Sequence, residues 1–538
     1  MGQHRIGSAY ELLVPFSMES RIETSRPCPP HRGPRATPIP SPPTRTLGSR
    51  ARYDAIVVGS GVGGAVTAAL LAQRGRRVLL LEKNDRLGGI LASFERHGFK
   101  LDAGSHLIAH GEKGTLGRVL RALGLARPRF LTHPIPVRSR GILELTAPTR
   151  RRGLARTGLE LVRALRLTAR ERRHLARLVF QVFTLTEPEL RLWDRRTLET
   201  FVRRYTDHPG VYFLLSFLAS IFFVLPPWQV SAGEALRALR GVLWSYRLSY
   251  VEGGMDSLIH ALLGEVVARG GELVVSRPAT RVRHGGHELV VTTDDGREYA
   301  APVVAANLAP ADLLPLLDGP ALPAPYVARA RSSRPSGNAH QLKLGLRRPL
   351  VEEGCLIGGL TMEGLTLADL SLPLMRRTVD QIAVGRASDP LAVYAPCPTN
   401  YDPSLGPEGQ QLLLVSLYGP TCEGPLDPPA VWKERGLAAL ARVLPGLEDE
   451  LLFAELTPVP EVAAWMGKSN CGAICTGQFP DQVGSARLSV ETPVPGLFLC
   501  GDGAGGRGIG TELAAASGVQ AARAMLRLLG RGVRSRHG

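Results

Sequence analysis

Five residues between Gly59 and Gly64 have the types and spacing needed to hold a phosphate group. Gly59, Gly61 and Gly64 follow the pattern Gly-x-Gly-x-x-Gly, with Ser60 and Gly63 between them. In this pattern the first glycine allows a tight turn, the second lets the backbone approach a pyrophosphate, and the third lets a helix pack closely on the preceding strand. Free N–H groups at the start of that helix favour a bound anion. We therefore expect this turn to bind a dinucleotide.

The elements predicted around this turn are those that such a site requires. The apolar run 55–58 predicts a buried parallel strand, residues 62–73 predict a helix, and residues 78–81 predict a second strand. Glu82 ends the second strand, eighteen residues beyond Gly64. A carboxylate there can accept hydrogen bonds from both hydroxyls of an adenosine ribose. Strand, turn, helix, strand and acid together are much more specific than the glycines alone.

A second candidate site lies near the end of the chain. Residues 497–500 predict a buried strand, and Gly501 and Asp502 follow it directly. A helix is predicted over 511–528, and the positive end of its dipole suits a group on which negative charge gathers. Glu512 in the first turn of that helix is unexpected beside such a group. The loop before the helix contributes the candidate residues Gly508, Ile509, Gly510 and Thr511.

Three segments occur in an order that resembles the phytoene desaturase family, which also includes carotenoid isomerases and retinol saturases. They are the first turn with a further glycine pair, Gly88 and Gly89, then the stretch 251–282, and finally the stretch 492–526. Two positions depart from the family pattern. Glu252 stands where proline is expected, and the loop 503–512 differs from the Pro-Gly-rich loop of phytoene desaturases themselves.

The resemblance implies FAD as the cofactor. It places the second glycine pair near the flavin's phosphate and ribityl chain, Asp502 on a ribityl hydroxyl, and the backbone near Val282 against the adenine. The cofactor-binding residues predicted in this way are Gly59, Ser60, Gly61, Gly63, Gly64, Glu82, Lys83, Gly88, Gly89, Val282, Gly501, Asp502, Gly508, Ile509, Gly510 and Thr511.

The predicted fold is α/β, with a Rossmann-like, discontinuous FAD-binding domain of the GR2 type and an inserted α+β substrate domain. The FAD-binding domain is expected to comprise residues 51–125, 245–310 and 481–530, and the substrate-binding domain residues 126–244 and 311–480. Residues 1–50 are rich in Pro and Arg and cannot bury enough apolar surface to offset their chain entropy. We expect them to form a disordered tail.

Composition limits the partners and the compartment. The formal net charge is +17, but no nucleic-acid-binding motif accompanies it, so we expect no nucleic-acid partner. Seven cysteines at irregular spacing argue for reduced thiols in the cytoplasm and against a disulfide framework. Cys471 and Cys475 have no second pair or nearby histidine, so no metal site is predicted.

The region expected to bind substrate contains the most apolar stretch of the chain, 210–228. It is shorter than the roughly twenty residues needed to span a bilayer, so a core helix and a helix that lines a lipophilic tunnel or dips into one leaflet both remain open. A lipophilic small-molecule substrate is expected. A basic helical region lies upstream, for which a solvated helix face and peripheral contact with the inner face of the cytoplasmic membrane both remain open. Its arginines are Arg150, Arg151, Arg152, Arg156, Arg163, Arg166, Arg170, Arg172, Arg173 and Arg177.

The chemistry implied by the resemblance is desaturation of a polyene or isoprenoid, in which a hydride leaves for flavin N5 and a proton leaves the neighbouring carbon. Ser105 and His106 are the candidate catalytic residues, and His106 is either a proton acceptor or a structural histidine. Trp465 and Lys468 are further candidates for reaching the pocket.

The sequence leaves several alternatives open. Isomerisation or saturation of a polyene through reduced flavin, amine oxidation, and a non-enzymatic lipid escort of the GDP-dissociation-inhibitor type all remain. No redox dithiol follows the first motif and no second Gly-x-Gly-x-x-Gly opens a helix, so the electron acceptor is not defined by the sequence.

Overall fold

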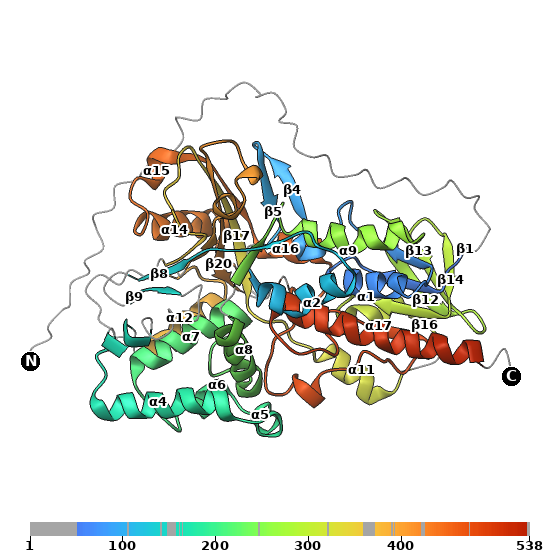
Figure 1. Ribbon diagram of the computed structural model, residues 1–538, viewed down its shortest axis with the longest axis horizontal. Helices are drawn as coiled ribbons and strands as arrows, with labels where there is room; N and C mark the ends of the chain where they lie inside the picture. Colours follow the sequence, from blue (N-terminus) through green and yellow to red (C-terminus); the bar gives the residue numbers. More distant parts are fainter. Residues whose placement is uncertain are drawn as a thin grey trace, which may run out of the picture. The chain divides into compact units, whose positions relative to one another are not determined.

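Five short parallel strands form the sheet that positions both glycine-rich segments (Figure 1). Four of the five are wholly buried, as expected of parallel strands covered on both faces. The predicted strands 55–58 and 78–81 are confirmed, and the predicted strand 497–500 ends one residue earlier. The order across the sheet is β11 (Glu272–Val274), β3 (Val78–Leu81), β2 (Ala55–Val58), β15 (Val303–Ala306) and β22 (Leu497–Leu499).

The computed structural model describes most of the chain beyond residue 50. The described residues are 51–104, 107–139, 143–147, 158–160, 162–163, 165–245, 248–319, 322–358, 372–388, 391, 393–420, 426–472 and 474–534. The expected tail, residues 1–50, therefore lies outside the described residues, and so do the candidate residues Ser105 and His106.

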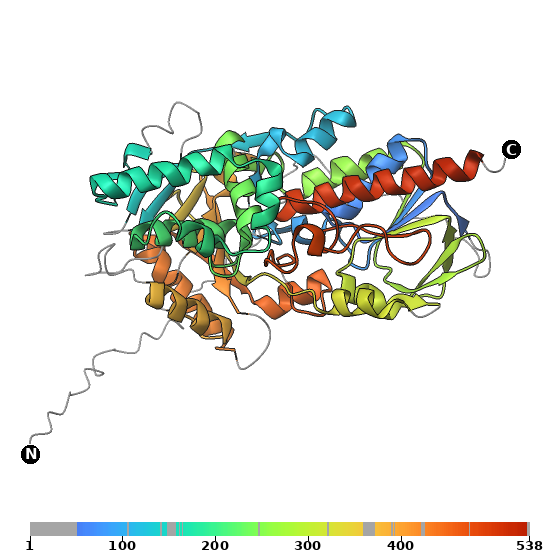
Figure 2. The same ribbon diagram turned by 90° about the horizontal axis from the view of Figure 1, so that it is seen from below.

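Three helices cover one face of the parallel sheet. They are α1 (Val62–Gln73), α9 (Asp256–Ala268) and α17 (Gly510–Arg534), which lie side by side in Figures 1 and 2. The predicted helix 62–73 is confirmed, whereas the helix predicted over 511–528 begins one residue earlier and ends six residues later. Alternate residues of the strands point into this helical core, as the two-residue period of a strand requires.

A second sheet of five strands covers the other face. The remaining residues of the parallel strands, such as Ile56 and Leu79, pack against it. Its order is β1 (Ala51–Arg52), β14 (Glu298–Ala301), β13 (Leu289–Thr293), β12 (Ala279–His284) and β16 (Leu317–Asp318).

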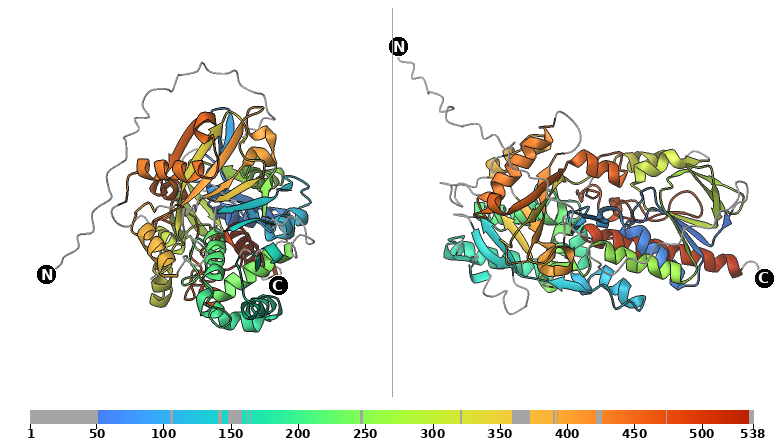
Figure 3. Two further views of the ribbon diagram at one scale, coloured as in Figure 1. Left: turned by 90° about the vertical axis from the view of Figure 1, so that its left-hand side faces the viewer. Right: turned by 90° about the horizontal axis from the view of Figure 1, so that it is seen from above.

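A mixed sheet of seven strands lies towards the other end of the molecule from the second five-stranded sheet (Figure 3). Its strand β17 is buried along its whole length, and α14 (Pro429–Ala441) packs on it. The order is β21 (Leu451–Thr457), β17 (Asn338–Leu346), β20 (Gln411–Gly419), β19 (Val393–Pro396), β18 (Cys355–Gly358), β8 (Ile135–Ser139) and β9 (Leu143–Ala147).

A layer of helices completes the structure (Figure 1). The apolar stretch 210–228 forms helix α7, which ends at Phe223. Among the described residues, no helix is both long enough and apolar enough to cross a bilayer. The helices of this layer are α4 (Ala169–Thr184), α5 (Glu187–Trp193), α6 (Leu198–Val202), α7 (Pro209–Phe223) and α8 (Ala232–Ser245).

The cysteines differ in part from the expectation. Cys355, Cys397, Cys475 and Cys500 are free and buried. Cys471 is disulfide-bonded. The prediction of reduced thiols is therefore wrong at Cys471, because the spacing of cysteines along a chain does not reveal which of them meet in the fold.

Candidate functional site

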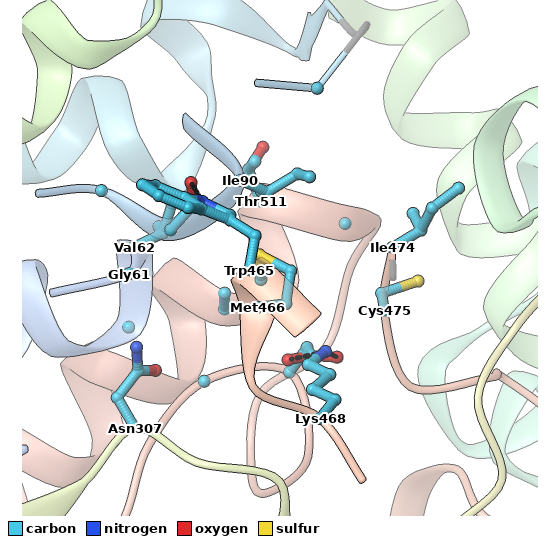
Figure 4. Close-up of a pocket in the computed structure, with 18 of the residues that line it drawn as sticks. Gly61, Val62, Ile90, Asn307, Trp465, Met466, Lys468, Ile474, Cys475 and Thr511 are labelled. Carbon is cyan, nitrogen blue, oxygen red and sulfur yellow. Dashed lines mark hydrogen bonds and ion pairs between the residues drawn. The ribbon is translucent and has the colours of Figure 1, made fainter. Parts of the chain in front are cut away.

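A single cavity of about 380 Å³ reaches both glycine-rich segments. Glu82, at the end of β3, and Asp502, after β22, both line it, so the two predicted halves of the site open onto one continuous space. Trp465 and Lys468 also line it, and Figure 4 shows both side chains in the cavity. The predicted residues on its wall are Gly59, Gly61, Gly63, Glu82, Lys83, Gly88, Gly89, Gly501, Asp502, Ile509, Gly510 and Thr511.

Four predicted residues do not line the cavity. Ser60, Gly64 and Gly508 lie behind its wall, where they hold the turn and the loop in place. Val282 pairs with Val291 and Leu317 inside the second sheet, and its backbone contact with adenine stays a prediction. A bulge in β12 between Ala279 and Arg281 precedes it. Arg277, Pro278 and Ala279, which come before the bulge, line the cavity.

The two predicted catalytic residues, Ser105 and His106, are not placed by the described part of the structure. Their described neighbours, Gly104 and Leu107, both line the cavity. The catalytic roles of Ser105 and His106 therefore stay predictions.

Ser60 joins the first turn to the acid and to the second glycine pair. Its backbone N–H and its hydroxyl both donate to Glu82 Oε2, at 2.8 and 2.5 Å. The same hydroxyl oxygen accepts from the N–H of Gly88 at 2.9 Å. Asn84 N–H donates to the other oxygen, Glu82 Oε1, at 2.9 Å. The Glu82 carboxylate is thus fixed in orientation at the edge of the cavity before any ligand arrives.

We expect Ser60→Ala to weaken FAD binding. The change removes two side-chain hydrogen bonds, one of them to a charged group, which together are worth about 1.5–3 kcal/mol. That corresponds to a roughly tenfold to hundredfold rise in Kd. Fluorescence titration of the apoprotein with FAD measures it. Ser332→Ala, at an exposed serine outside the cavity, is the control and should leave Kd unchanged.

Asn307 was missed by the sequence analysis. It directly follows β15, its backbone N–H donates to Val58 O at 2.8 Å, and its side chain lies against Gly61 (Figure 4). A Cβ on Gly61 would come within 2.7 Å of its amide nitrogen, and a Cβ on Gly501 within 2.5 Å of its amide oxygen. Asn307 therefore lies where both glycine-rich segments meet. Its signal in the sequence is a polar residue at the carboxyl end of a buried parallel strand, where ligands bind in such sheets.

Asp502 is held by a cation and by the backbone. Lys468 Nζ lies 3.1 Å and 3.3 Å from its two carboxylate oxygens, and the backbone N–H of Thr476 donates to the same carboxylate. Burial alone would raise the pKa of Asp502, but the charge of Lys468 and the bond from Thr476 outweigh it and hold the pKa below its ordinary value. Asp502 is therefore a carboxylate at neutral pH, and it lines the cavity.

The glycine-rich loop after Asp502 is fixed by the helical layer. Arg507 pairs with Asp194 at 2.8 Å and also with Glu234, both of which are buried. The side-chain amide of Gln478 donates to Gly508 O at 2.8 Å. Contacts from α8, from Asp194 directly after α5 and from Gln478 thus set the path of the loop that leads into α17.

Glu512 does not face the cavity, which explains its presence in the first turn of α17. Its carboxylate accepts from the backbone N–H of Thr115 and, at 3.4 Å, from that of Leu116. These are N–H groups at the start of α2 (Thr115–Ala122), whose own cap residue, Gly114, offers no side chain. Glu512 therefore caps a helix that lies almost four hundred residues earlier in the sequence.

We expect Glu512→Ala to lower the melting temperature by several degrees, because it leaves buried N–H groups of α2 without a partner, a cost of about 1–3 kcal/mol. Burial raises the pKa of Glu512. A raised carboxyl pKa means that its stabilising contribution is fullest below the ordinary pKa and declines as pH rises through the raised value. Glu512→Gln keeps an acceptor oxygen without the buried charge, so at pH 7 it should lose much less than Glu512→Ala. Thermal denaturation followed by circular dichroism compares the two variants, and equal losses would contradict the capping role.

The far end of the cavity is apolar. Helix α7 contributes Ile221 and Phe222, and strands of the mixed sheet contribute residues such as Ile357 and Val393. Its polar groups are neutral: Ser220, Gln341, Tyr394, Ser416 and Tyr418. The charged side chains on the described cavity wall are Glu82, Lys83, Arg277, Lys468 and Asp502, all of which belong to the cofactor segments or pair with them.

Similarity to known proteins identifies the class of enzyme to which this chain belongs. The family model of flavin containing amine oxidoreductases matches residues 62–526. The chain belongs to this family: it is an FAD-dependent oxidoreductase with a Rossmann-like α/β fold, as the sequence predicted.

Solved structures share the fold. An oxidoreductase from Methanosarcina mazei superposes with a TM-score of 0.62 at 20% identity, covering 86% of this chain and 98% of its own. Putrescine oxidase bound to putrescine superposes with a TM-score of 0.62 at 15% identity, covering 90% and 100%.

Curated relatives match over short segments. The all-trans-retinol 13,14-reductase of Rattus norvegicus is 42% identical over 69 residues, which is 13% of this chain and 11% of that protein. The chloroplastic prolycopene isomerase of Daucus carota is 40% identical over 99 residues, or 18% and 16%. The predicted resemblance to carotenoid isomerases and retinol saturases is confirmed over these segments.

Proposed function

We propose that this FAD-dependent oxidoreductase acts on a long apolar polyene or isoprenoid, which it desaturates, isomerises or saturates. The observation that carries the proposal is the apolar end of the cavity, where the described wall has neutral side chains only and continues directly from the cofactor segments. The names of the matched relatives, a retinol reductase and a prolycopene isomerase, support a substrate of this kind.

The residues on the wall fit FAD. Side chains are missing where a dinucleotide would pass: Gly61 and Gly63 line the cavity, and a Cβ on either would meet Asn307 within 3 Å. We assign Glu82 to the adenosine ribose, Asp502 to the ribityl chain, and the start of α17 at Gly510 to the electron-rich edge of the flavin ring. When bound, FAD supplies a hydride acceptor or donor at N5.

The protein's own part is to place the substrate and exclude water. Ile221 and Phe222 would hold an apolar chain against the ring end of the cavity, in a space that offers it no charge. We assign to His106 the role of accepting the proton that leaves the carbon next to the hydride-donating carbon. Ser105 precedes His106 in the chain. The position of Gly104 and Leu107 on the cavity wall supports this assignment.

Amine oxidation is the second candidate, favoured by the family description and by the fold shared with putrescine oxidase. The two candidates differ in charge. An ammonium substrate needs a carboxylate, and the described wall carries two. Asp502 is already paired with Lys468, at 3.1 Å. Glu82 already accepts from the N–H groups of Ser60 and Asn84. The cavity therefore favours the polyene.

A non-enzymatic lipid escort is disfavoured by the intact glycine turn, because an escort has no use for a dinucleotide site. The purified protein should be yellow, whereas an escort without flavin would be colourless. We further propose a cytoplasmic protein in peripheral contact with the membrane, because a lipophilic substrate is stored there.

Incubation of the purified flavoprotein with a polyene and with a primary amine tests the function. With oxidised and with chemically reduced flavin in separate tubes, we expect the absorbance bands of the polyene to shift in at least one tube. The amine should leave the flavin oxidised. Anaerobic bleaching of the flavin by the amine, with an unchanged polyene in both tubes, would favour the amine oxidase instead.

A further inference from the structure

Helix α4 carries apolar side chains on two opposite sides. Leu178 and Val182 point inwards and are buried in the core of the helical layer. On the outer side Val179, Phe180 and Phe183 are 47%, 63% and 42% exposed. Single exposed apolar residues are ordinary on soluble proteins, but three within two turns of one helix, two of them aromatic, mark a contact surface.

The first half of the same helix is basic. Arg170, Arg172, Arg173 and Arg177 are all exposed, and none of them forms an ion pair within the described part of the chain. Glu171 is the only acidic residue of α4, and its carboxylate is bound to the backbone and the hydroxyl of Thr168. The outer side of α4 thus presents uncompensated positive charge next to exposed aromatic rings.

This surface is held firmly. From α8, the guanidinium of Arg240 donates to Val182 O at 2.8 Å and to Leu185 O at 2.7 Å, which ties down the last turn of α4. His174 bonds to Tyr205 O at 2.8 Å on the first half. Figure 1 shows α4 at the outer margin of the helical layer, with α6, α7 and α8 between it and the sheets. The exposed rings therefore stand on a fixed helix at the edge of the layer.

We propose that the outer side of α4, formed by Arg170, Arg172, Arg173, Arg177, Val179, Phe180 and Phe183, docks on an anionic lipid surface. Its arginines match the charge of anionic headgroups, and its rings match the acyl boundary beneath them. Helix α7, which belongs to the same core cluster, lines the apolar end of the cavity with Ile221 and Phe222. The docking surface rests on the proposed function, since it brings the cavity close to the phase in which a polyene dissolves.

Co-sedimentation of the full-length flavoprotein with vesicles tests this surface. Vesicles of phosphatidylcholine alone and of phosphatidylcholine with phosphatidylglycerol are the two probes. We expect binding to the anionic vesicles, weakened by added salt, and at least tenfold weaker binding to the neutral ones. Phe180→Glu/Phe183→Glu and, separately, Arg172→Gln/Arg173→Gln/Arg177→Gln should each weaken binding to the anionic vesicles at least tenfold.

Leu528→Glu is the matched control, because Leu528 is 42% exposed on α17, at the opposite side of the view from α4 in Figure 1. All variants should keep the flavin absorbance, which reports an intact fold. The proposal is overturned if the wild type ignores anionic vesicles, if the α4 variants bind as well as Leu528→Glu, or if gel filtration shows a dimer that Phe180→Glu/Phe183→Glu disperses.

A separate assay distinguishes this proposal from the proposed function. With the polyene delivered in detergent, the α4 variants should turn it over as fast as the wild type. If no polyene reacts while the vesicle binding behaves as expected, the proposed function fails and the docking surface stands.

Discussion

Gly63→Ala is expected to yield a protein that has lost its yellow colour. A Cβ at this position would lie 2.5 Å from the backbone nitrogen of Gly501 and 2.7 Å from its Cα. Both are backbone atoms, so no side chain can move aside, and the two glycine-rich segments must separate. Overpacking of this kind costs up to about 3 kcal/mol. If the whole cost falls on the bound state, FAD affinity drops roughly hundredfold. The flavin content of the purified variant and titration of its apoprotein with FAD measure the loss.

Gly264→Ala is the control for this change. Gly264 lies within α9, and a Cβ there meets nothing within 4 Å, so alanine should stabilise the helix by up to about 1 kcal/mol and leave the flavin bound. A Gly63→Ala protein that retains FAD at wild-type affinity would mean that the contact between the first turn and Gly501 has no part in the site.

Lys468→Met is expected to damage both stability and flavin binding. It leaves the Asp502 carboxylate, whose side chain is 21% exposed, without its cation, although the bond from Thr476 remains. Removing one partner of a buried pair costs about 3 kcal/mol, and the pKa of Asp502 should rise. The double variant Lys468→Met/Asp502→Asn removes the unpaired charge and should recover part of the stability.

The pH dependence of stability also tests the pair formed by Lys468 and Asp502. The pKa of Asp502 in the folded protein lies below its ordinary value. Asp502 therefore stabilises the fold at pH values above the ordinary pKa, and this stabilisation is lost as pH falls through the lowered pKa. In Lys468→Met the loss of stability on acidification should begin at a higher pH. Melting temperatures of wild type and variant between pH 3 and pH 7 test this, and parallel curves would show that Lys468 does not set the charge state of Asp502.

Much of the cofactor site could be predicted because its signals are local. The spacing from Gly59 to Gly64, the acid at the end of the next strand and the Gly501-Asp502 ending each depend on the carboxyl end of one strand, and parallel strands bring those ends to one edge. Asn307 has the same kind of signal, a polar residue after a buried strand, and was overlooked because it stands alone without a glycine pattern.

Other parts of the site depend on contacts between distant segments. Glu512 caps α2 and Lys468 meets Asp502 only because the fold brings these residues together, and no periodicity in the sequence encodes either pairing. Val282 lies beyond the bulge in β12, whereas Arg277, Pro278 and Ala279, which line the cavity, lie before it.

A crystal structure of the protein purified with its flavin tests most directly whether one FAD joins the two glycine-rich segments. We expect one continuous molecule in the cavity, with the adenosine ribose on Glu82, the ribityl chain beside Asp502, and the flavin ring between Thr511 and the apolar residues of α7. A flavin bound elsewhere, or a molecule that reaches Glu82 but leaves Asp502 untouched, would contradict this arrangement.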